Sequence, residues 1–487
     1  MKLKQLLERV AFSWVQGDPD TEITGVAYDS RVADKGNLFV CIPGTVTDGH
    51  DYIPMALAHG VSAFVVTREV SVPAGAAVVR VEDAREALAV CSAAWFGYPA
   101  EKLTTVGITG TKGKTTTAYM VYQMLNGAGI KTGLIGTVEN IIGDEHLPAS
   151  HSTPESYLVQ KYFSEMVERG CKAVVMEVSS QGLKLKRVAG IVYDIGLFTN
   201  LEPDHIGPRE HESFEDYLEC KGLLFRQCRL GLVNADDAHT EQVLRGHTCK
   251  VLAFGMGEGC DYRAEEVNLH SSSGKMGVAY RLTGKRNFPV VVNIPGAFSV
   301  YNSLAAIGVA SELGVSEDTM LACLRTIRVR GRVELVPVSE NYTVMVDYAH
   351  NGMALRSLLT TLREYEPKRL VCVFGCGGNR SRERRFEMGE ISSRLADLTI
   401  ATSDNPRFEE PQEILNDIIS GIEKGPGKYV AIIDRKEAIR YALEHAEPGD
   451  CIVIAGKGHE DYQEIKGVKY PMDDREMIQR AAEELAI

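Results

Sequence analysis

The sequence predicts an α/β protein of three domains: a small N-terminal α/β domain, a central P-loop-type domain with a mostly parallel sheet, and a C-terminal doubly wound, Rossmann-like domain. Its 487 residues correspond to about three domains of ~100–200 residues each. Short β-branched, apolar runs alternate with segments of helical periodicity, as in parallel sheets that helices cover. The content of 44% hydrophobic and 24% charged residues is that of a globular protein.

The first predicted domain comprises residues 1–101. Its apolar runs at 36–42, 62–67 and 77–81 are separated by turn residues and are expected to be strands. A linker is expected around Pro99.

The second predicted domain comprises residues 102–332. It opens with a β-branched run at 103–110, and a helix is expected over 115–126 because apolar residues recur there at helical spacing before a glycine. Residues 260–294 alternate in the manner of antiparallel strands. Further buried strands are expected at 173–178, 194–200, 231–234 and 251–254.

The third predicted domain comprises residues 333–487, where the alternation is clearest. In such a sheet, ligands bind beyond the carboxyl ends of the strands. Strands are expected at 343–348, 370–374, 398–402, 429–433 and 451–455, and helices at 354–365, 385–396, 411–423 and 436–445.

A phosphate site is predicted where the strand at 103–110 meets the following helix. Backbone N–H groups and the dipole at a helix start bind anions, Lys114 can reach the β- and γ-phosphates, and the Thr115 hydroxyl can bind Mg²⁺. The spacing is a variant, since the first glycine of the general pattern would fall at Ile108. An ordinary glycine turn is the alternative, which the strand–loop–helix context disfavours. The predicted ATP contacts here are Gly110, Thr111, Lys112, Gly113, Lys114, Thr115 and Thr116.

Glu177 ends the next strongly apolar strand. A carboxylate there would face the phosphate loop and could hold Mg²⁺. The alternative is a solvated residue at a strand end.

Charge and cysteine usage exclude several classes of protein. A net charge of −13 does not suit a nucleic-acid binder. The 11 cysteines include no CxxC pair, so free thiols in a reducing compartment are expected, and a metal role for Cys372 and Cys376 is disfavoured. The start of the sequence lacks the long apolar stretch of a signal peptide, and nowhere do ~18 apolar residues run together. We therefore expect a cytoplasmic protein without membrane insertion.

Six motifs, in this order, resemble the Mur ligases of bacterial cell-wall synthesis, and the similarity covers essentially the whole chain. Together they are far more specific than any one of them. They are the phosphate loop, Met176-Glu-Val-Ser-Ser180, Thr199-Asn-Leu-Glu-Pro-Asp-His205, Gly331-Arg332, Asp347-Tyr-Ala-His350 and Asp404-Asn-Pro-Arg407.

The resemblance implies one domain each for a UDP-sugar, for ATP and for an incoming amino acid. It implies that the γ-carboxylate of UDP-N-acetylmuramoyl-L-alanyl-D-glutamate attacks ATP and that an amine then attacks the acyl phosphate. A carboxylate is a poor electrophile until its oxygen becomes a good leaving group, and the charge on the moving phosphoryl group calls for Lys114 and Mg²⁺.

By resemblance, the Mg²⁺ positions are Thr115, Glu177 and His205, although His205 could instead be a buried structural histidine. Lys221 matches a lysine that the family carries as a CO₂-derived carbamate, which would be a further Mg²⁺ ligand. The implied catalytic residues are Lys114, Lys221 and His205. The implied nucleotide contacts outside the loop are Asn302, Arg332 and Asp347.

The resemblance also implies contacts to the UDP-sugar peptide. Arg187 suits the carboxylates of that substrate, whereas Ser30 on its own would be read as a turn serine. The implied contacts are Ser30, Thr45, Ser152, Thr153, Ser179 and Arg187.

The Asp-Asn-Pro-Arg segment is similar to the signature of family members that use meso-diaminopimelate. That amino acid carries a second carboxylate, which the fork of Arg407 can bind bidentately, and Glu460 suits the distal ammonium. The alternative for Arg407 is a surface arginine in a turn. Nearby Arg382, Arg384 and Arg385 are expected to be a solvated helix start. The implied contacts are Arg380, Asp404, Asn405, Pro406, Arg407, Gly456 and Glu460.

Three departures from the family pattern are visible: the Asn351-Gly-Met continuation, the loose match of His211, and Leu185 where glutamine is common. Four alternatives stay open: the same ligase reaction with L-lysine, a folate polyglutamate or cyanophycin type of ligase, a non-catalytic sensor of UDP-linked precursors, and a small-molecule kinase. The expected partners are small-molecule substrates, and a monomer is expected.

Overall fold

The computed structural model describes residues 1–44, 47–203, 206–207, 210–272 and 275–486. The chain forms two compact units, the first made of Met1–Asp261 with Ala305–Ser316 and the second of Tyr262–Leu304 with Glu317–Ile487. The predicted domain boundaries near residues 101 and 332 stay predictions. Within the described ranges, no helix combines the length and the apolar character needed to cross a bilayer.

The first unit begins with a five-stranded sheet in the order β1-β5-β4-β3-β2, and the apolar runs predicted as strands are β3, β4 and β5. Only β1 is antiparallel to its neighbour. Asp83 caps α3 by accepting hydrogen bonds from the backbone N–H groups of Arg85 and Glu86. The elements are α1 Leu3–Leu6, β1 Ser13–Gln16, β2 Gly25–Ala27, β3 Asn37–Val40, η1 Gly49–Tyr52, α2 Ile53–Ala58, β4 Ala63–Val66, β5 Ala77–Arg80, α3 Ala84–Trp95 and η2 Pro99–Lys102.

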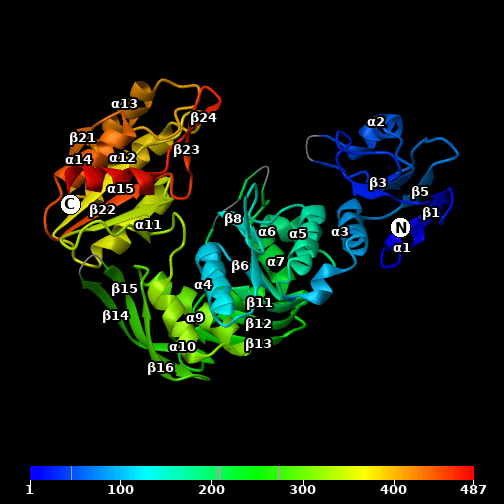
Figure 1. Ribbon diagram of the computed structural model, residues 1–487, viewed down its shortest axis with the longest axis horizontal. Helices are drawn as coiled ribbons and strands as arrows, with labels where there is room; N and C mark the ends of the chain where they lie inside the picture. Colours follow the sequence, from blue (N-terminus) through cyan, green and yellow to red (C-terminus); the bar gives the residue numbers. More distant parts are fainter. Residues whose placement is uncertain (45–46, 204–205, 208–209, 273–274, 487) are drawn as a thin grey trace. The chain divides into compact units, whose positions relative to one another are not determined.

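The larger sheet of the first unit runs in the order β13-β12-β11-β6-β10-β7-β8-β9 and is parallel from β13 to β7. This confirms the mostly parallel sheet that the sequence predicts. Helix α3 packs against α5 (Figure 1). The elements are β6 Thr104–Thr109, α4 Lys114–Gly127, β7 Thr132–Ile135, β8 Glu139–Ile142, β9 Glu145–Pro148, α5 Ser156–Glu168, β10 Ala173–Glu177, α6 Ser180–Lys184, β11 Tyr193–Phe198, α7 Phe214–Gly222, η3 Leu223–Arg226, β12 Cys228–Asn234, α8 Thr240–Val243 and β13 Lys250–Gly255.

Three antiparallel strands open the second unit, as the alternation at 260–294 predicts. They are β14 Tyr262–Ser272, β15 Lys275–Gly284 and β16 Phe288–Val292, and they are followed by α9 Phe298–Glu312 and α10 Glu317–Thr326.

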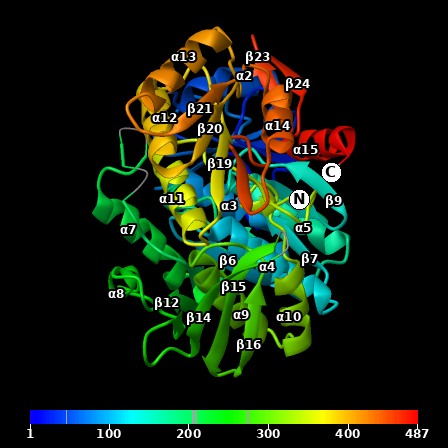
Figure 2. The same ribbon diagram turned by 90° about the vertical axis from the view of Figure 1, so that its left-hand side faces the viewer.

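A six-stranded sheet in the order β17-β18-β22-β19-β20-β21 forms the rest of the second unit. Helices α11, α12 and α13 lie on one face and α14 and α15 on the other (Figure 2), so the predicted doubly wound fold is confirmed. The elements are β17 Glu334–Leu335, β18 Thr343–Asp347, α11 Gly352–Arg363, β19 Arg369–Phe374, α12 Glu383–Leu395, β20 Leu398–Ala401, α13 Pro411–Ile422, β21 Lys428–Ala431, α14 Arg435–Glu444, β22 Asp450–Ala455, β23 Tyr462–Ile465, β24 Val468–Pro471 and α15 Asp474–Leu485. The β23–β24 hairpin was not predicted.

The expectation that Arg385 is solvated is wrong. Its side chain is 1% exposed and donates to Asp417 at 3.0 Å and to Glu409 at 2.7 Å. A buried guanidinium requires such partners, and the helix face that carries it turns toward α13. Arg382 remains exposed and reaches Asp417 from the surface at 2.6 Å.

Candidate functional site

The predicted phosphate loop joins the end of β6 to the start of α4. Gly113 stands at the N-cap of α4 with a φ of 82°, a left-handed conformation that favours glycine. Thr115 and Thr116 lie in the first helical turn, where backbone N–H groups have no acceptor within the helix. This geometry can bind an anion.

The loop is held by the two residues that directly follow the neighbouring strand β11. The backbone of Asn200 accepts from Thr111 N at 2.8 Å, and its side-chain oxygen accepts from Lys112 N at 2.9 Å. The Thr199 hydroxyl donates to Lys112 O at 2.7 Å. A Cβ atom on Gly110 would lie 1.9 Å from Thr199 Oγ1, so this contact requires glycine. The Lys112 side chain lies outside the loop in an exposed ion pair with Glu202.

Two lysines converge on the loop. Lys114 Nζ donates to the carbonyl oxygens of Gly110 at 2.8 Å and Thr111 at 3.0 Å. Lys221, on α7, is 1% exposed, and its Nζ also donates to Gly110 O at 2.8 Å. The Lys221 ammonium also lies 4.4 Å from the centre of the Tyr217 ring. Contacts within the protein therefore fix its position.

Glu177 ends β10 and is 1% exposed. It pairs with Ile108 of β6 in the parallel register, so its carboxylate and the loop share one end of the sheet. The carboxylate accepts from the Thr137 backbone at 2.8 Å and from the Thr137 hydroxyl at 3.0 Å. Thr137 in turn contacts Ser152 Oγ at 2.7 Å. The carboxylate keeps lone pairs for a cation.

The predicted sugar-peptide contacts of the central sheet form one network. Thr153 Oγ1 lies 3.1 Å from Ser179 Oγ and donates to Glu177 O at 3.0 Å. Arg187 donates to Thr153 O at 2.9 Å, and its buried Nε has no hydrogen-bond partner among the described residues. Arg187 Nε lies 3.7 Å from Glu155 Oε2, so a carboxylate of the protein faces this donor beyond hydrogen-bond distance.

Ser30 lies apart from these networks. Ser30 is buried in the segment that follows β2. Thr45 and His205 lie outside the described residues.

The predicted nucleotide contacts outside the loop belong to the second unit. Asn302 is buried in α9. Asp347 ends β18, and its carboxylate accepts from the backbone N–H groups of Val333 and Ala349, both at 2.8 Å. Burial raises the pKa of Asp347, although Arg332 opposes the rise. The Arg332 guanidinium lies over the Tyr348 ring at 5.1 Å.

The predicted amino-acid contacts surround the turn after β20. Asn405 donates to Glu460 at 2.8 Å, and the fully buried Lys457 donates to Asn405 at 3.2 Å and to Glu460 at 3.3 Å. Arg407 donates from Nη1 to Gly378 O at 2.9 Å and from Nε to Glu464 at 3.2 Å. The turn therefore brings together groups of both charges that can bind a zwitterion.

The remaining predicted contacts differ in their settings. Gly456 follows β22, and a Cβ atom there would lie 3.0 Å from Asp404 Oδ2. Pro406 is buried, and its carbonyl oxygen lies 2.0 Å from where a Cβ atom of Gly378 would stand. Arg380 is exposed in the segment after β19, so the structure does not bring it into the network around Asn405.

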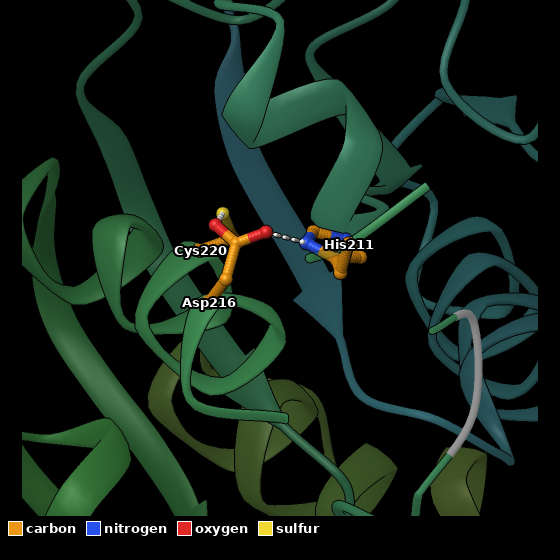
Figure 3. Close-up of side chains that lie close together, drawn as sticks. All are labelled: His211, Asp216 and Cys220. Atoms are coloured by element: carbon orange, nitrogen blue, oxygen red, sulfur yellow. Dashed lines mark hydrogen bonds and ion pairs between the residues drawn. The ribbon is translucent and has the colours of Figure 1, made fainter. Parts of the chain in front are cut away.

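His211, which precedes α7, forms a side-chain cluster with Asp216 and Cys220 of that helix (Figure 3). Their ligand atoms lie within 4.8 Å of one another, as in a metal site. However, Lys184 Nζ already lies 2.6 Å from Asp216 Oδ2, and burial raises the pKa of the Cys220 thiol to about 12. A cation would meet an ammonium and a neutral thiol. We conclude that the cluster is a hydrogen-bonded link.

The link joins α7, which carries Lys221, to α6, whose N-cap is Ser179. His211 Nε2 lies 2.9 Å from Ser180 Oγ of α6, and Nδ1 lies 3.0 Å from Asp216 of α7. The loose match of His211 to the family pattern thus marks a buried histidine with two partners.

Several functional neighbours were missed from the sequence. Thr137 and Lys457 follow strands β7 and β22, and the ends of parallel strands were the available signal for both. Glu464 lies on a hairpin strand, which gave no such signal.

Comparison with known proteins agrees with this geometry. Residues 22–96 match the Mur ligase family catalytic domain, 108–310 the Mur ligase middle domain, and 331–458 the Mur ligase glutamate ligase domain. Similar proteins include "UDP-N-acetylmuramoyl-L-alanyl-D-glutamate--2,6-diaminopimelate ligase" of Caldanaerobacter subterraneus subsp. tengcongensis, 43% identical over 98% of both chains. A protein of that name, numbered 1, from Clostridium acetobutylicum is 41% identical over 100% of both chains.

A solved structure of a UDP-N-acetylmuramoyl-L-alanyl-D-glutamate--2,6-diaminopimelate ligase is also similar. It has a TM-score of 0.74 and 28% identity, covering 100% of this chain and 99% of its own. These matches extend over the phosphate loop, the carboxylate strand and the Asp-Asn-Pro-Arg turn alike, and the chain belongs to the Mur ligase family.

Proposed function

We propose that this protein uses ATP to add meso-2,6-diaminopimelate to the D-glutamate γ-carboxylate of UDP-N-acetylmuramoyl-L-alanyl-D-glutamate, in peptidoglycan precursor synthesis. The relatives that share its full length carry the name of this ligase. The observation that selects the amino acid is the turn at 404–407, where Arg407 lies in one connected network with Glu460.

The first unit supplies the phosphoryl-transfer groups. The start of α4 and Lys114 bind the phosphates of ATP, and the buried Glu177 supplies a carboxylate at the same sheet end. The Thr115 hydroxyl and Glu177 are hard oxygen donors, which suit Mg²⁺, and His205 would join them. The bound Mg²⁺ would neutralise charge on the phosphate oxygens.

Lys221 can serve this site in a modified form. A carbamate forms when the neutral Lys221 amine adds to CO₂ and loses a proton, and it replaces a positive group with an anionic oxygen ligand. Because Lys221 Nζ reaches the loop carbonyl of Gly110, the carbamate would stand beside the phosphates and suit a second Mg²⁺.

The reaction proceeds in two balanced steps. An oxygen of the D-glutamate carboxylate attacks the γ-phosphorus of ATP, and ADP leaves. The neutral amine of the incoming amino acid attacks the acyl carbon, phosphate leaves with the bonding pair, and the nitrogen loses a proton. Lys114 stabilises the charge on the transferred group, while Thr153, Ser179 and Arg187 orient the sugar peptide.

Arg407 and Glu460 account for the choice of amino acid. The distal end of meso-diaminopimelate carries a carboxylate and an ammonium, which match a guanidinium and a carboxylate respectively. L-lysine lacks the distal carboxylate and would leave Arg407 without its ligand. A sensor would bind the same precursors, but it would not require Lys114 and Lys221 on one loop carbonyl.

Phosphate release tests this function. The purified chain is given ATP, Mg²⁺, bicarbonate and UDP-N-acetylmuramoyl-L-alanyl-D-glutamate, with meso-diaminopimelate or L-lysine in parallel. We expect release with diaminopimelate and little with lysine. Equal release with lysine would contradict the amino-acid assignment alone, whereas no release with either would contradict the ligase function.

A further inference from the structure

The β23–β24 hairpin borders the turn that carries Arg407. The Arg407 backbone donates to Glu464 O at 2.9 Å, and its carbonyl accepts from Lys466 N at 2.7 Å. Glu464 N also donates to Asn405 Oδ1 at 2.8 Å. The hairpin therefore fixes the backbone on which the guanidinium is mounted.

Arg407 has an unusual backbone conformation. Its φ of 52° lies in the left-handed region, which costs a non-glycine residue roughly 1–2 kcal/mol. Such conformations persist where the surroundings hold them. Here the two backbone hydrogen bonds to residues 464 and 466 provide that support.

The Arg407 side chain is fixed at two of its nitrogens. Nε donates to Glu464 Oε2 at 3.2 Å, and Nη1 donates to Gly378 O at 2.9 Å. A Cβ atom at Gly377 would lie 2.8 Å from Nη1, so glycine leaves the guanidinium room. The Arg407 and Glu464 side chains are 21% and 23% exposed, hence still open to a ligand.

A second cationic side chain, that of Lys469, lies near Glu464. Lys469 faces it across the hairpin in the antiparallel register. The Lys469 ammonium lies instead over the Tyr462 ring, 3.9 Å from its centre. The carboxylate of Glu464 thus pairs with the arginine of the turn and not with its cross-strand neighbour.

We propose that Glu464 is a positioning residue for Arg407, and that it sets the affinity for an amino acid with a distal carboxylate. The proposal rests on the proposed function. Nε and Nη1 are held by Glu464 and Gly378 before the substrate binds. The guanidinium is therefore already oriented, and less side-chain entropy is lost on binding. In the proposed function, Arg407 binds the distal carboxylate, which takes no part in the reaction. Loss of Glu464 should therefore change KM for the amino acid and leave kcat unchanged.

Two substitutions at this position test the proposal. Glu464→Leu removes the acceptor for Arg407 Nε, and we expect KM for meso-diaminopimelate to rise about tenfold, which corresponds to about 1.4 kcal/mol. The kcat and the KM for ATP should change by less than about twofold, within ordinary surface effects. Glu464→Gln keeps an acceptor oxygen, and its KM should stay close to that of the unmodified enzyme.

A third variant alters the surroundings of Arg407 Nη1 and leaves Glu464 in place. Gly377→Ala places a methyl group against Nη1 and should also raise KM for diaminopimelate selectively. Glu476→Leu is the matched control, since it removes an exposed carboxylate that pairs with Arg480 on α15. It should change none of these constants.

The outcomes separate this proposal from the function on which it rests. An unmodified enzyme that releases no phosphate with diaminopimelate would refute the proposed function. An active enzyme whose KM is unchanged in Glu464→Leu would overturn only the role of Glu464. A KM that falls in both Glu464 variants would overturn it too, because Glu464 would then be a competitor for the guanidinium. So would a Glu464→Gln enzyme as impaired as Glu464→Leu.

Discussion

Lys221 and Gly110 are joined by a hydrogen bond of 2.8 Å, from a buried ammonium to a carbonyl of the phosphate loop. The two residues are 111 positions apart in the chain, so α7 is packed in a way that delivers one lysine to the loop. In the proposed function, this position puts either the ammonium or its carbamate beside the phosphates of ATP.

Removal of the Lys221 amine should abolish most activity. We expect Lys221→Met to lower kcat by at least about a hundredfold, since charge stabilisation at a transferring group is worth ~10²–10³ in rate. Phosphate release measures the rate. Lys161→Met, which alters an exposed lysine of α5, is the control and should retain full activity.

The mass of the intact protein tests the carbamate itself. In bicarbonate, the protein without substitutions should carry the added mass of CO₂, and the Lys221→Met variant should not. Added mass that persists in the variant would assign the modification to another amine.

Glu177→Gln should raise the Mg²⁺ requirement. The amide retains an oxygen for Thr137 but loses the charge that holds a divalent cation. We expect an activity loss of about a hundredfold that added Mg²⁺ partly reverses, with a stability loss of ~1–2 kcal/mol from the altered Thr137 contacts. A Mg²⁺ titration of phosphate release and a thermal melt measure both effects. An unchanged Mg²⁺ dependence would argue against Glu177 as a ligand.

Arg407→Lys should weaken diaminopimelate binding. Lysine cannot offer the planar fork that binds a carboxylate bidentately, so KM for diaminopimelate should rise about 10–100-fold, or about 1.4–2.8 kcal/mol. The steady-state constants for each substrate decide the matter. Arg394→Lys, at an exposed i,i+4 pair with Glu390, is the control. An equal loss of kcat with no change in KM would contradict a role in binding.

His211 should make stability depend on pH. Burial lowers the pKa of His211, against the opposing effect of Asp216. Its neutral form is therefore favoured in the folded state, so this contribution is complete above the unfolded pKa of about 6.5 and is lost as the pH falls toward the lower folded value.

Asp216 should affect the free energy of unfolding only at a more acidic pH than His211 does. Burial would raise this pKa, but Lys184 and His211 outweigh it and lower the pKa to about 2. Urea unfolding at a series of pH values should thus show a loss of stability below about pH 6.5 that is reduced in His211→Asn. Parallel curves for both proteins would refute the assignment.

Much of the fold was accessible from the sequence, because parallel strands read as continuous apolar runs. The strands around the phosphate loop and Glu177 were predicted within one or two residues. The β23–β24 hairpin was not, because β23 is only partly buried, β24 is exposed, and neither strand has an apolar run.

The site was only partly predictable for a related reason. Lys114 and Arg407 stand in recognisable local patterns, whereas Lys221 is an unremarkable helical lysine that only the family resemblance singled out. The burial of Arg385 could not be predicted from its neighbours in the sequence, because its partners Asp417 and Glu409 lie later in the chain.

The attachment of the phosphate loop to Thr199 and Asn200 bears on protein engineering. Besides its own Lys114, the loop is held by hydrogen bonds from two residues that directly follow the adjacent strand β11. A graft of residues 110–115 onto another strand and helix would therefore carry the glycines and lysines but lose the hydroxyl and amide that shape them. The transferable unit is the pair of adjacent strands with both of their ends.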